Sequence, residues 1–514
     1  MEFDILVMLM RTSHLPVKHT SLWIDTTSKP NFLSMSASSL YDVVIIGAGI
    51  VGLTSAYFLT QEGLKVAVIE SRKILQGVTG YTTAKVTSQH GLIYKHLIDN
   101  FGVEKAQQYA DANQTAIQKI RDIVKKHSIE CDLLTKNAYT YTDDIKKIED
   151  EVEAAQKLHL PATFEDNTPL PLHIEGSIKF SNQAQFHPTK YLLALAEIIM
   201  KKGGSVFEET QFLDMEEGKT CKILTDKGSV KAKHVIIASN YPVYDKAMYF
   251  SRLTPKRSYV LAVTLAGKAP EGMFYNDFSQ IYSFRNQPYK KGELFLIGGQ
   301  NHTTGETGDE RERYKKLEKY ARKHFDIKSI EYSWSTHDPV SIDQVPFVGF
   351  HTPNSKNVYV ASGFGGWGMT NGTVSGILLT DLIMRRKNPW QDVYNPNRFK
   401  PVTSTPKITS SVKTVIKNYS EKLLPKKEDN PNDLKEGEGR IMTIKGKKLA
   451  MYKDEKGHIC PLSAVCTHMG CIVKFNTAEK SWDCPCHGSR FNTDGTVIHG
   501  PAIKPLEKKE LVIS

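Results

Sequence analysis

Apolar, β-branched stretches alternate with amphipathic stretches in the first third of the chain. Residues 41–46 read Tyr-Asp-Val-Val-Ile-Ile, which predicts a short buried strand. Residues 53–62 have the apolar spacing of a helix, and Gly63 predicts its end. Residues 64–69, Leu-Lys-Val-Ala-Val-Ile, predict a second strand. Strands of this kind joined by a helix predict a parallel sheet.

The same pattern returns in two later parts of the chain. A helix predicted over 187–202 precedes short strands at 205–207 and 235–238. A strand predicted at 357–361 leads into an apolar helix that reaches Met384. Between these parts the pattern differs, because the residues there predict long helices and strands of an antiparallel sheet. These predicted elements are helices over 103–127 and 143–157 and a strand over 255–263.

The last quarter of the chain has a different composition. Prolines interrupt the pattern after residue 386, and residues 398–430 combine prolines and lysines with one amphipathic stretch, 412–424, which predicts a linker. From about residue 431, short apolar runs are separated by glycines and charged turns, which predicts a small β domain. Its predicted strands are 439–444, 448–452, 457–461 and 510–513.

A glycine-rich turn joins the first predicted strand to the first predicted helix. Gly47, Gly49 and Gly52 spell G-x-G-x-x-G, and Glu70 follows the second strand. The first glycine permits the tight turn, the second lets the backbone approach a pyrophosphate, and the third lets the helix pack on the strand. The helix N-terminus favours phosphate charge, and the acid can bind ribose hydroxyls. Strand, turn, helix and acid together predict a dinucleotide site.

Two further loops favour FAD over NAD at this site. Residues 77–84 are rich in glycine and threonine and can offer hydroxyl and amide groups to a diphosphate. Residues 362–370, Ser-Gly-Phe-Gly-Gly-Trp-Gly-Met-Thr, precede the last apolar helix. We interpret this second loop as lying over the pyrimidine end of a flavin, where the helix dipole stabilises negative charge on the reduced ring.

These residues resemble the D-amino-acid-oxidase-like family of FAD oxidoreductases, which includes glycine oxidase and sarcosine oxidase. The likeness spans about 41–385 and is carried by VVIIGAGIVGL, VIE, HPTKYLLALAEIIMKKGGSVFEET, VIIASN and NVYVASGFGGWGMT. It implies an α/β FAD-binding domain of the Rossmann type, interleaved with an α+β substrate domain. The residues that it assigns to FAD are Gly47, Gly49, Gly52, Glu70, Arg72, Thr82, Thr83, Phe212, Gly363, Gly365, Gly366, Gly368, Met369 and Thr370.

The implied division of the chain follows that family. Residues 1–40 carry no clear period, and we expect them to be a loose arm or to include a mis-assigned start. The expected FAD parts are 41–91, 186–245 and 336–385, the substrate parts are 92–185 and 246–335, the linker is 386–430, and the β domain is 431–514.

Cysteine and histidine gather in one window of the β domain. Its two halves read CTHMGC from residue 466 and CPCHGS from residue 484. Each half offers a cysteine and a histidine plus one additional cysteine. That set suits a [2Fe-2S] cluster in which two thiolates hold one iron and two imidazoles hold the other. A Cys₂His₂ zinc site is the alternative, but zinc explains neither the additional cysteines nor the closing Gly-Ser.

The two halves closely resemble the Rieske family, in the form that serves electron transfer. The resemblance implies Cys466 and Cys484 on one iron, His468 and His487 on the other, and a disulfide between Cys471 and Cys486. It also implies that Ser489 donates to a bridging sulfide, whereas Phe491 stands where high-potential members carry a tyrosine. Because one hydrogen bond to sulfur is missing, we expect a potential in the lower half of the Rieske range, roughly −150 to +300 mV.

Composition and charge limit the classes of partner. The chain has 514 residues, 24% of them charged, and a net charge of +11. Its lysines are scattered without interleaved aromatic residues, which argues against nucleic acid and leaves a solvated surface, an acidic electron-transfer partner or an anionic membrane face. No apolar stretch reaches 18 residues, so no transmembrane segment is predicted. Cys131, Cys221 and Cys460 form no secreted disulfide framework, which favours a cytoplasmic protein, with peripheral membrane contact left open.

The two resemblances together imply a dehydrogenase. The flavin would accept hydride from the C–N bond of a small amine or amino acid, and the cluster would pass single electrons through its exposed histidine edge to a protein or quinone. Two alternatives are a reductase or monooxygenase with reversed electron flow, and a redox carrier or sensor without a substrate.

The sequence offers only weak candidates for the substrate pocket. Arg257 could clamp a substrate carboxylate, although a structural arginine is equally expected. Tyr259 and Trp367 could wall the pocket, and His337 with Asp338 is expected to form a turn with satisfied side chains.

Overall fold

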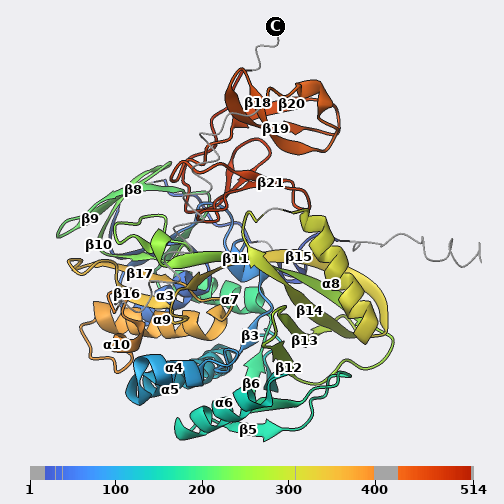
Figure 1. Cartoon of the computed structure of the whole chain (residues 1–514). Coiled ribbons are helices and arrows are strands. Elements are labelled where there is room, and N and C mark those ends of the chain that lie inside the picture. The colour runs from blue at the N-terminus through green and yellow to red at the C-terminus, as the bar shows by residue number, and fades with distance from the viewer. Residues whose placement is uncertain (1–17, 29, 37–38, 307, 399–426, 511–514) are drawn as a thin grey trace, which may run out of the picture.

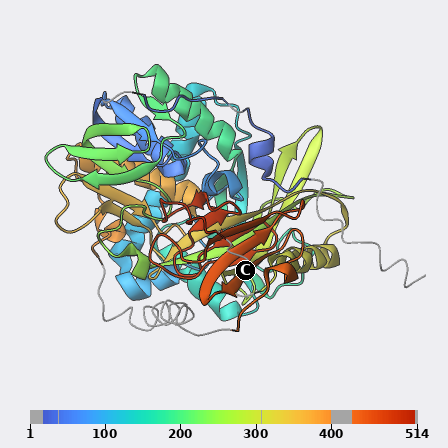
Figure 2. The same ribbon diagram turned by 90° about the horizontal axis from the view of Figure 1, so that it is seen from above.

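The computed structural model describes residues 18–28, 30–36, 39–306, 308–398 and 427–510. Figure 1 shows an α/β layer at the left, a second sheet with its own helices at the lower right, and a small β domain above both. From above, the C-terminal domain covers the centre of the molecule (Figure 2). In the part of the chain that is described, we find no helix long and apolar enough to cross a membrane.

The first sheet is built on β1 (Leu40–Ile46), and it carries the predicted parallel core. Its order is β16-β17-β10-β1-β2-β7, with β8 and β9 as an antiparallel extension of β10. Ile45 pairs with Ile236 on one side and Val68 on the other, both in parallel register. The other strands are β2 (Val66–Ile69), β7 (Ser205–Phe207), β8 (Phe212–Glu216), β9 (Cys221–Thr225), β10 (Gly228–Ile237), β16 (Phe347–Phe350) and β17 (Val358–Ser362).

Helix α3 (Ile50–Gln61) follows the glycine-rich turn and packs against both α7 (Pro188–Lys201) and α9 (Gly368–Ile383). The predicted helix therefore exists but begins three residues earlier, because the backbone becomes helical directly after Gly49. His187 caps α7, since its side chain accepts a hydrogen bond from the Lys190 amide. These helices bury their apolar residues on the sheet, which explains why the strands are apolar on both faces.

The second sheet has the order β15-β11-β14-β13-β12-β4-β6-β3, with β5 paired to β6. It is antiparallel except where β12 runs parallel to β4. Its strands are β3 (Lys85–Val86), β4 (Leu134–Thr142), β5 (Ala162–Glu165), β6 (Gly176–Gln185), β11 (Leu253–Leu265), β12 (Met273–Asn276), β13 (Tyr282–Tyr289), β14 (Gly292–Thr303) and β15 (Ile327–Ser341). Helices α6 (Ile145–Lys157) and α8 (Glu310–His324) contact this sheet. Helix α4 (Tyr94–Phe101) packs on α6 and on α5 (Val103–His127), which also packs on α9, and the short α10 (Gln391–Tyr394) packs on α5 and β16.

The described part of the N-terminal segment is not the loose arm that we expected. Helix α2 (Leu22–Asp25) places Trp23 in the core with no exposed surface. The Trp23 indole donates to the Thr82 carbonyl at 2.6 Å, and Phe32 and Met35 are also buried. Aromatic burial of this kind fixes the segment against the loop that follows β2.

The C-terminal domain has two small antiparallel sheets. The first contains β18 (Gly439–Ile444), β19 (Lys447–Lys453) and β20 (Ile459–Ser463), as predicted. The second, nearer the rest of the molecule in Figure 1, contains β21 (Lys474–Asn476), β22 (Ser481–Asp483), β23 (Arg490–Asn492) and β24 (Val497–His499). The predicted stretches 412–424 and 511–513 lie outside the described residues.

Candidate functional site

The glycine-rich turn forms a close junction between strand and helix. Gly47 has φ +110°, and a Cβ at this residue would lie 2.6 Å from the Ala238 carbonyl oxygen. A Cβ at Gly52 would lie 1.9 Å from the Gly47 carbonyl oxygen. Only glycine fits both positions, because helix α3 and strand β10 approach the turn from two sides. The turn therefore holds the N-terminus of α3 close to the end of β1, where a ligand can approach it.

A cavity of about 400 Å³ begins at this turn and extends to the start of α9. Nine of the predicted FAD residues line it: Gly47, Gly49, Glu70, Arg72, Thr82, Phe212, Gly366, Gly368 and Met369. Gly52, Thr83, Gly363, Gly365 and Thr370 are not part of its lining. Gly52 acts through packing, and the Thr370 hydroxyl donates to the Thr87 carbonyl at 2.9 Å.

Thr79, which the sequence analysis did not single out, stands at the N-terminus of α3. Its hydroxyl accepts a hydrogen bond from the Ile50 amide at 3.1 Å, and Glu70 Oε2 accepts one from the Ala48 amide at 3.0 Å. Both side chains line the cavity. They satisfy donors that an anionic ligand would otherwise meet, so they shape the phosphate end of the site.

The C-terminal domain supplies one wall of the same cavity, which no sequence signal indicated. The wall consists of Thr496, Val497, Ile498, His499, Gly500, Ala502, Ile503 and Pro505. The Gln211 side-chain amide donates to the Ile503 carbonyl at 2.6 Å and joins this wall to the first domain. The dinucleotide cavity is therefore built from both domains.

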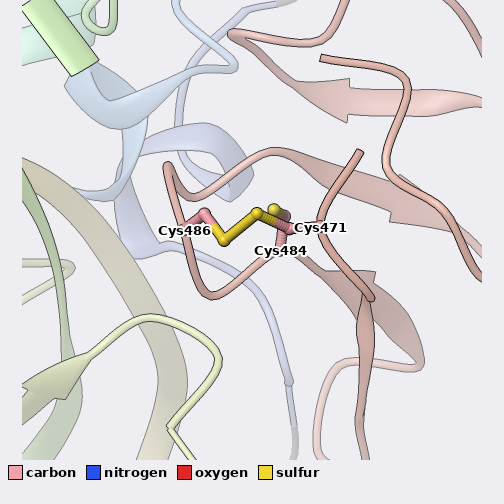
Figure 3. A group of neighbouring side chains, drawn as sticks. All are labelled: Cys471, Cys484 and Cys486. Carbon is pink, nitrogen blue, oxygen red and sulfur yellow. A yellow bond between two sulfur atoms is a disulfide. The ribbon is translucent and has the colours of Figure 1, made fainter. Parts of the chain in front are cut away.

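The predicted disulfide is present between Cys471 and Cys486, with an S–S length of 2.03 Å. Figure 3 shows it beside Cys484, and the three sulfur atoms lie within 4.8 Å of one another. The two sulfurs of the disulfide are not available as thiolate ligands, because each is bonded to the other. Cys466 and Cys484 are buried free thiols, so they are the cysteines that could hold a metal.

Two histidines face each other beside these thiols. The ring centroids of His468 and His487 lie 5.0 Å apart. Nδ1 of His468 and both ring nitrogens of His487 are buried without a hydrogen-bond partner among the described residues. Buried imidazole nitrogens normally have a hydrogen-bond partner. Ring nitrogens without one are therefore suited to bind a metal. The Ser489 hydroxyl accepts from the Ala502 amide at 3.0 Å and also bonds the Cys466 side chain, which places its proton among the sulfur atoms.

The histidine edge does not have the exposure that we expected. His487 is 1% exposed and packs against Phe250 and Tyr241 of the first domain, at centroid distances of 5.4 and 6.3 Å. The expectation of an exposed histidine edge is therefore wrong for His487. His468 keeps partial exposure, and its neighbour Met469 is 37% exposed.

Arg257 is not placed as a substrate clamp. Its guanidinium donates to Glu479 of the C-terminal domain at 3.0 Å and to the Ser335 hydroxyl at 2.9 Å. Arg490 also bonds Glu479 and, at 3.0 Å, Asp483. Burial alone would raise the pKa of Glu479 and Asp483, but the two arginines hold both values below their ordinary range. The candidate clamp is thus one partner of a buried ion-pair network that docks the two domains.

The other weak candidates have structural contacts of their own. The Tyr259 hydroxyl meets His302 Nε2 at 3.0 Å, in a fully buried position beneath α8. Trp367 stacks on His90 with a centroid distance of 5.0 Å and borders the start of α9. His337 lies in β15 instead of a turn, and its Nε2 has no partner among the described residues, contrary to expectation. A Cβ at Gly488 would lie 2.4 Å from that nitrogen, so the C-terminal domain sits directly on His337.

Comparison with known proteins decides the family. The family described as FAD dependent oxidoreductase, DAO, matches residues 42–382. The Rieske [2Fe-2S] domain family matches residues 426–510. The chain is also similar to YhfW of Bacillus subtilis (strain 168), whose name describes a Rieske 2Fe-2S iron–sulfur protein. The two are 39% identical over 494 residues, which cover 95% of this chain and 97% of YhfW.

The chain belongs to the DAO family of FAD-dependent oxidoreductases and carries a C-terminal Rieske domain. It is also similar to the gamma-glutamylputrescine oxidoreductase of Escherichia coli (strain K12), with 22% identity over 385 residues, 71% of this chain and 89% of that protein. Its fold is similar to glycine oxidase from Geobacillus kaustophilus, with a TM-score of 0.58 and 16% identity over 71% of this chain and all of that one. The Rieske match decides between an iron–sulfur cluster and zinc in favour of the cluster.

This DAO–Rieske protein is an oxidoreductase that uses FAD and a [2Fe-2S] cluster. The residues present fit both groups. The glycine-rich turn and the N-terminus of α3 line the cavity where a pyrophosphate would lie, and Glu70 at the end of β2 suits a ribose. Two buried thiols and two unpartnered imidazoles suit the cluster.

Proposed function

We propose that this protein is a dehydrogenase that oxidises a small amine or amino acid and releases the electrons singly through the Rieske domain. One observation carries the proposal. Tyr241 lines the FAD cavity and also contacts His487, so one aromatic side chain separates the cavity from a cluster ligand. This contact suits electron transfer between the two cofactors, and the similarity to amine and amino-acid oxidoreductases favours the direction from flavin to cluster.

The proposed oxidation converts one C–N single bond of the substrate into a C=N double bond and removes two electrons. The C–H bond next to nitrogen breaks with its electron pair, the amine loses a proton to solvent, and the product is an imine that water hydrolyses. When bound, FAD accepts the hydride and the cluster accepts one electron at a time, so a one-electron acceptor must react twice per substrate. The similarity to DAO enzymes, among them the gamma-glutamylputrescine oxidoreductase, supports this substrate class.

The chain's own residues would hold the two groups in a fixed relation. We assign Cys466 and Cys484 to one iron, His468 and His487 to the other, and the Ser489 hydroxyl to a sulfide. Because His487 is buried against Tyr241 and Phe250, it is the ligand on the entry side for electrons. His468 is partly exposed beside Met469, so we assign the exit toward an external acceptor to that side.

Anaerobic mixing of the holoprotein with amines and amino acids tests the proposal. We expect the flavin absorbance to bleach first and the reduced-cluster EPR signal to follow. Bleaching without any EPR signal would contradict the relay. Cluster reduction by an added electron donor, followed by flavin reduction and no response to substrate, would indicate the reverse flow.

A ligand variant separates the two half-reactions. His487→Ala should retain substrate-driven flavin bleaching but lose turnover with a one-electron acceptor, because the cluster no longer forms. His458→Ala, an exposed histidine of the same domain, is the matched control and should behave like the native protein. If His487→Ala has native turnover, electrons do not pass through the cluster.

A further inference from the structure

The face of the second sheet that meets the FAD cavity carries an acidic residue, Asp338. Tyr275, Ser283, Gly298, Val260 and Trp334 form one row across strands β12, β13, β14, β11 and β15. Asp338 is four residues after Trp334 on β15, so it projects from the same face as Tyr275. The Pro339 carbonyl accepts from the Gly365 amide at 3.0 Å, which holds Asp338 beside the loop that opens α9.

The charges around the cavity are unevenly distributed. Among the described residues of its lining, the side chains with a formal charge are Glu70, Arg72 and Asp338. Glu70 and Arg72 lie together at the end of β2, where the Arg72 guanidinium donates to the Gln76 carbonyl at 3.0 Å. His337 stays neutral, since burial lowers its pKa to about 3. The α9 end of the cavity therefore has a carboxylate and no cation among the described lining residues.

Three cations of this sheet have other partners. Lys256 stands opposite Asp338 in the register of β11 and β15, but its ammonium donates to the Thr303 hydroxyl at 3.4 Å and Lys256 is not part of the cavity lining. Arg257 is held by Glu479 and Ser335, as described above. The Lys85 ammonium donates to the Ser283 hydroxyl, and Lys85 is not part of the cavity lining. Burial raises the pKa of Asp338 to about 6, against the opposing effect of the Thr336 hydroxyl. At neutral pH Asp338 is still mainly a carboxylate. The part of its surface that is exposed faces the cavity.

Aromatic residues lie next to the same end of the cavity, since Trp367 stands between the lining residues Gly366 and Gly368. The Tyr275 and Trp367 centroids lie 5.1 Å apart, and Trp367 stacks on His90. Burial raises the pKa of Tyr275, and the nearby charges of Asp277 and Asp338 add to this effect, so Asp338 lies close to that ring. Aromatic faces attract ammonium groups, and a carboxylate beside them strengthens the attraction.

We propose that Asp338 selects substrates that carry a second positive charge, the class of diamines and polyamines, over α-amino acids. The distal ammonium of such a substrate would pair with Asp338, whereas an α-carboxylate there would be repelled. This inference rests on the proposed amine oxidation and names its substrate class. Electrons and protons balance as in that oxidation, because the distal ammonium and Asp338 undergo no net change.

Anaerobic flavin bleaching by the holoprotein tests this assignment. The probes are 1,4-diaminobutane, n-butylamine of the same chain length, and the amino acids glycine and alanine. We expect the diamine to have an apparent Kd at least about tenfold lower than that of n-butylamine, and the amino acids to react most weakly. Asp338→Asn should abolish the difference between the two amines, and Asp338→Glu should keep part of it.

Asp277→Asn is the matched control, since Asp277 also lies near Tyr275 but outside the cavity. It should leave the diamine preference unchanged. The assignment is wrong if n-butylamine binds as well as the diamine, if an amino acid is preferred, or if Asp338→Asn retains the native preference with FAD still bound. Those outcomes leave amine or amino-acid oxidation standing. If dithionite bleaches the flavin and none of the probes does, the proposed function fails and the assignment fails with it.

Discussion

Phe491 has no exposed surface and pairs with Trp482 between strands β23 and β22. It belongs to the apolar core that also contains Cys466 and Cys484. A hydroxyl on this ring would enter a dry environment beside the sulfur ligands, where a donor stabilises the reduced, more negative cluster. We therefore expect the residue at this position to influence the potential of the cluster.

We predict that Phe491→Tyr raises the cluster potential above the native value. The native potential should fall in the lower half of the Rieske range of roughly −150 to +300 mV. An EPR-monitored redox titration measures both. Phe475→Tyr is the control, because Phe475 packs on the other side of Trp482 and should leave the potential unchanged. A native value near the top of the range, or no rise in Phe491→Tyr, would contradict the prediction.

At the scale of elements, the junction of β1 and α3 depends on the absence of side-chain atoms. Gly52 lies in the first turn of α3 directly over the Gly47 carbonyl. The helix can approach the strand only because neither residue has a Cβ. This approach orients the helix N-terminus toward the pyrophosphate.

We predict that Gly52→Ala binds FAD at least about a hundredfold more weakly, since a Cβ 1.9 Å from a carbonyl oxygen must push α3 off β1. Fluorescence titration of the apoprotein with FAD measures the change. Ser55→Ala in the same helix is the control, because its hydroxyl has no partner among the described residues and its removal leaves the packing intact. The cluster EPR signal should persist in both variants. Native FAD affinity in Gly52→Ala would show that the helix does not set the phosphate site.

Strand β15 shows how one element can serve two sites. His337 and Asp338 are neighbours in it, and neighbouring residues of a strand point to opposite faces. His337 lies under Gly488 of the Rieske domain, whereas Asp338 lies on the face of the sheet that carries Tyr275. The same strand therefore contributes to docking and, in our proposal, to substrate choice.

At the scale of the whole molecule, the two domains are joined by charges that water hardly reaches. The Arg257 side chain is 1% exposed and its partner Glu479 is 14% exposed. Both carboxyl groups of the network, Glu479 and Asp483, have depressed pKa values. Their stabilisation is complete above their ordinary pKa values, near 4, and is lost as the pH falls through the depressed values.

We predict that Glu479→Gln destabilises the docked state at pH 7 by about 3–5 kcal/mol, because Arg257 and Arg490 lose the carboxylate that they share and the buried Asp483 alone must balance two guanidinium groups. Transfer from flavin to cluster should slow in the same variant, and FAD should dissociate faster because one cavity wall belongs to the Rieske domain. Thermal unfolding and stopped-flow absorbance measure these effects. As the pH falls below about 4, the stability difference between native and variant proteins should shrink.

The control for that experiment is Glu507→Gln. Glu507 pairs with Lys509 on the surface of the same domain, and its side chain is 71% exposed. Exposed pairs contribute about 0–1 kcal/mol, so this variant should match the native protein. If Glu479→Gln is as stable as Glu507→Gln and transfers electrons at the native rate, the ion-pair network does not hold the domains together.

Local periodicity and short motifs were enough to predict the elements that depend on neighbouring residues. These are the strand, turn and helix at Gly47, the helices α5 and α6, and the spacing of cysteine and histidine. The disulfide was predicted only through the resemblance to the Rieske family. The starts of helices were less certain: α3 begins at Ile50, since capping geometry is decided by backbone contacts.

Contacts between segments that are distant in the chain could be seen only in the folded protein. Arg257 and Glu479 are 222 residues apart, and Gln211 and Ile503 are 292 apart, so no local pattern could pair them. For the same reason the sequence could not show that His487 points toward the flavin domain, that Trp23 is buried, or that Asp338 faces a cavity. A charged or aromatic residue has the same local pattern whether it faces water, a substrate or another domain, and only the packing of distant segments distinguishes these environments.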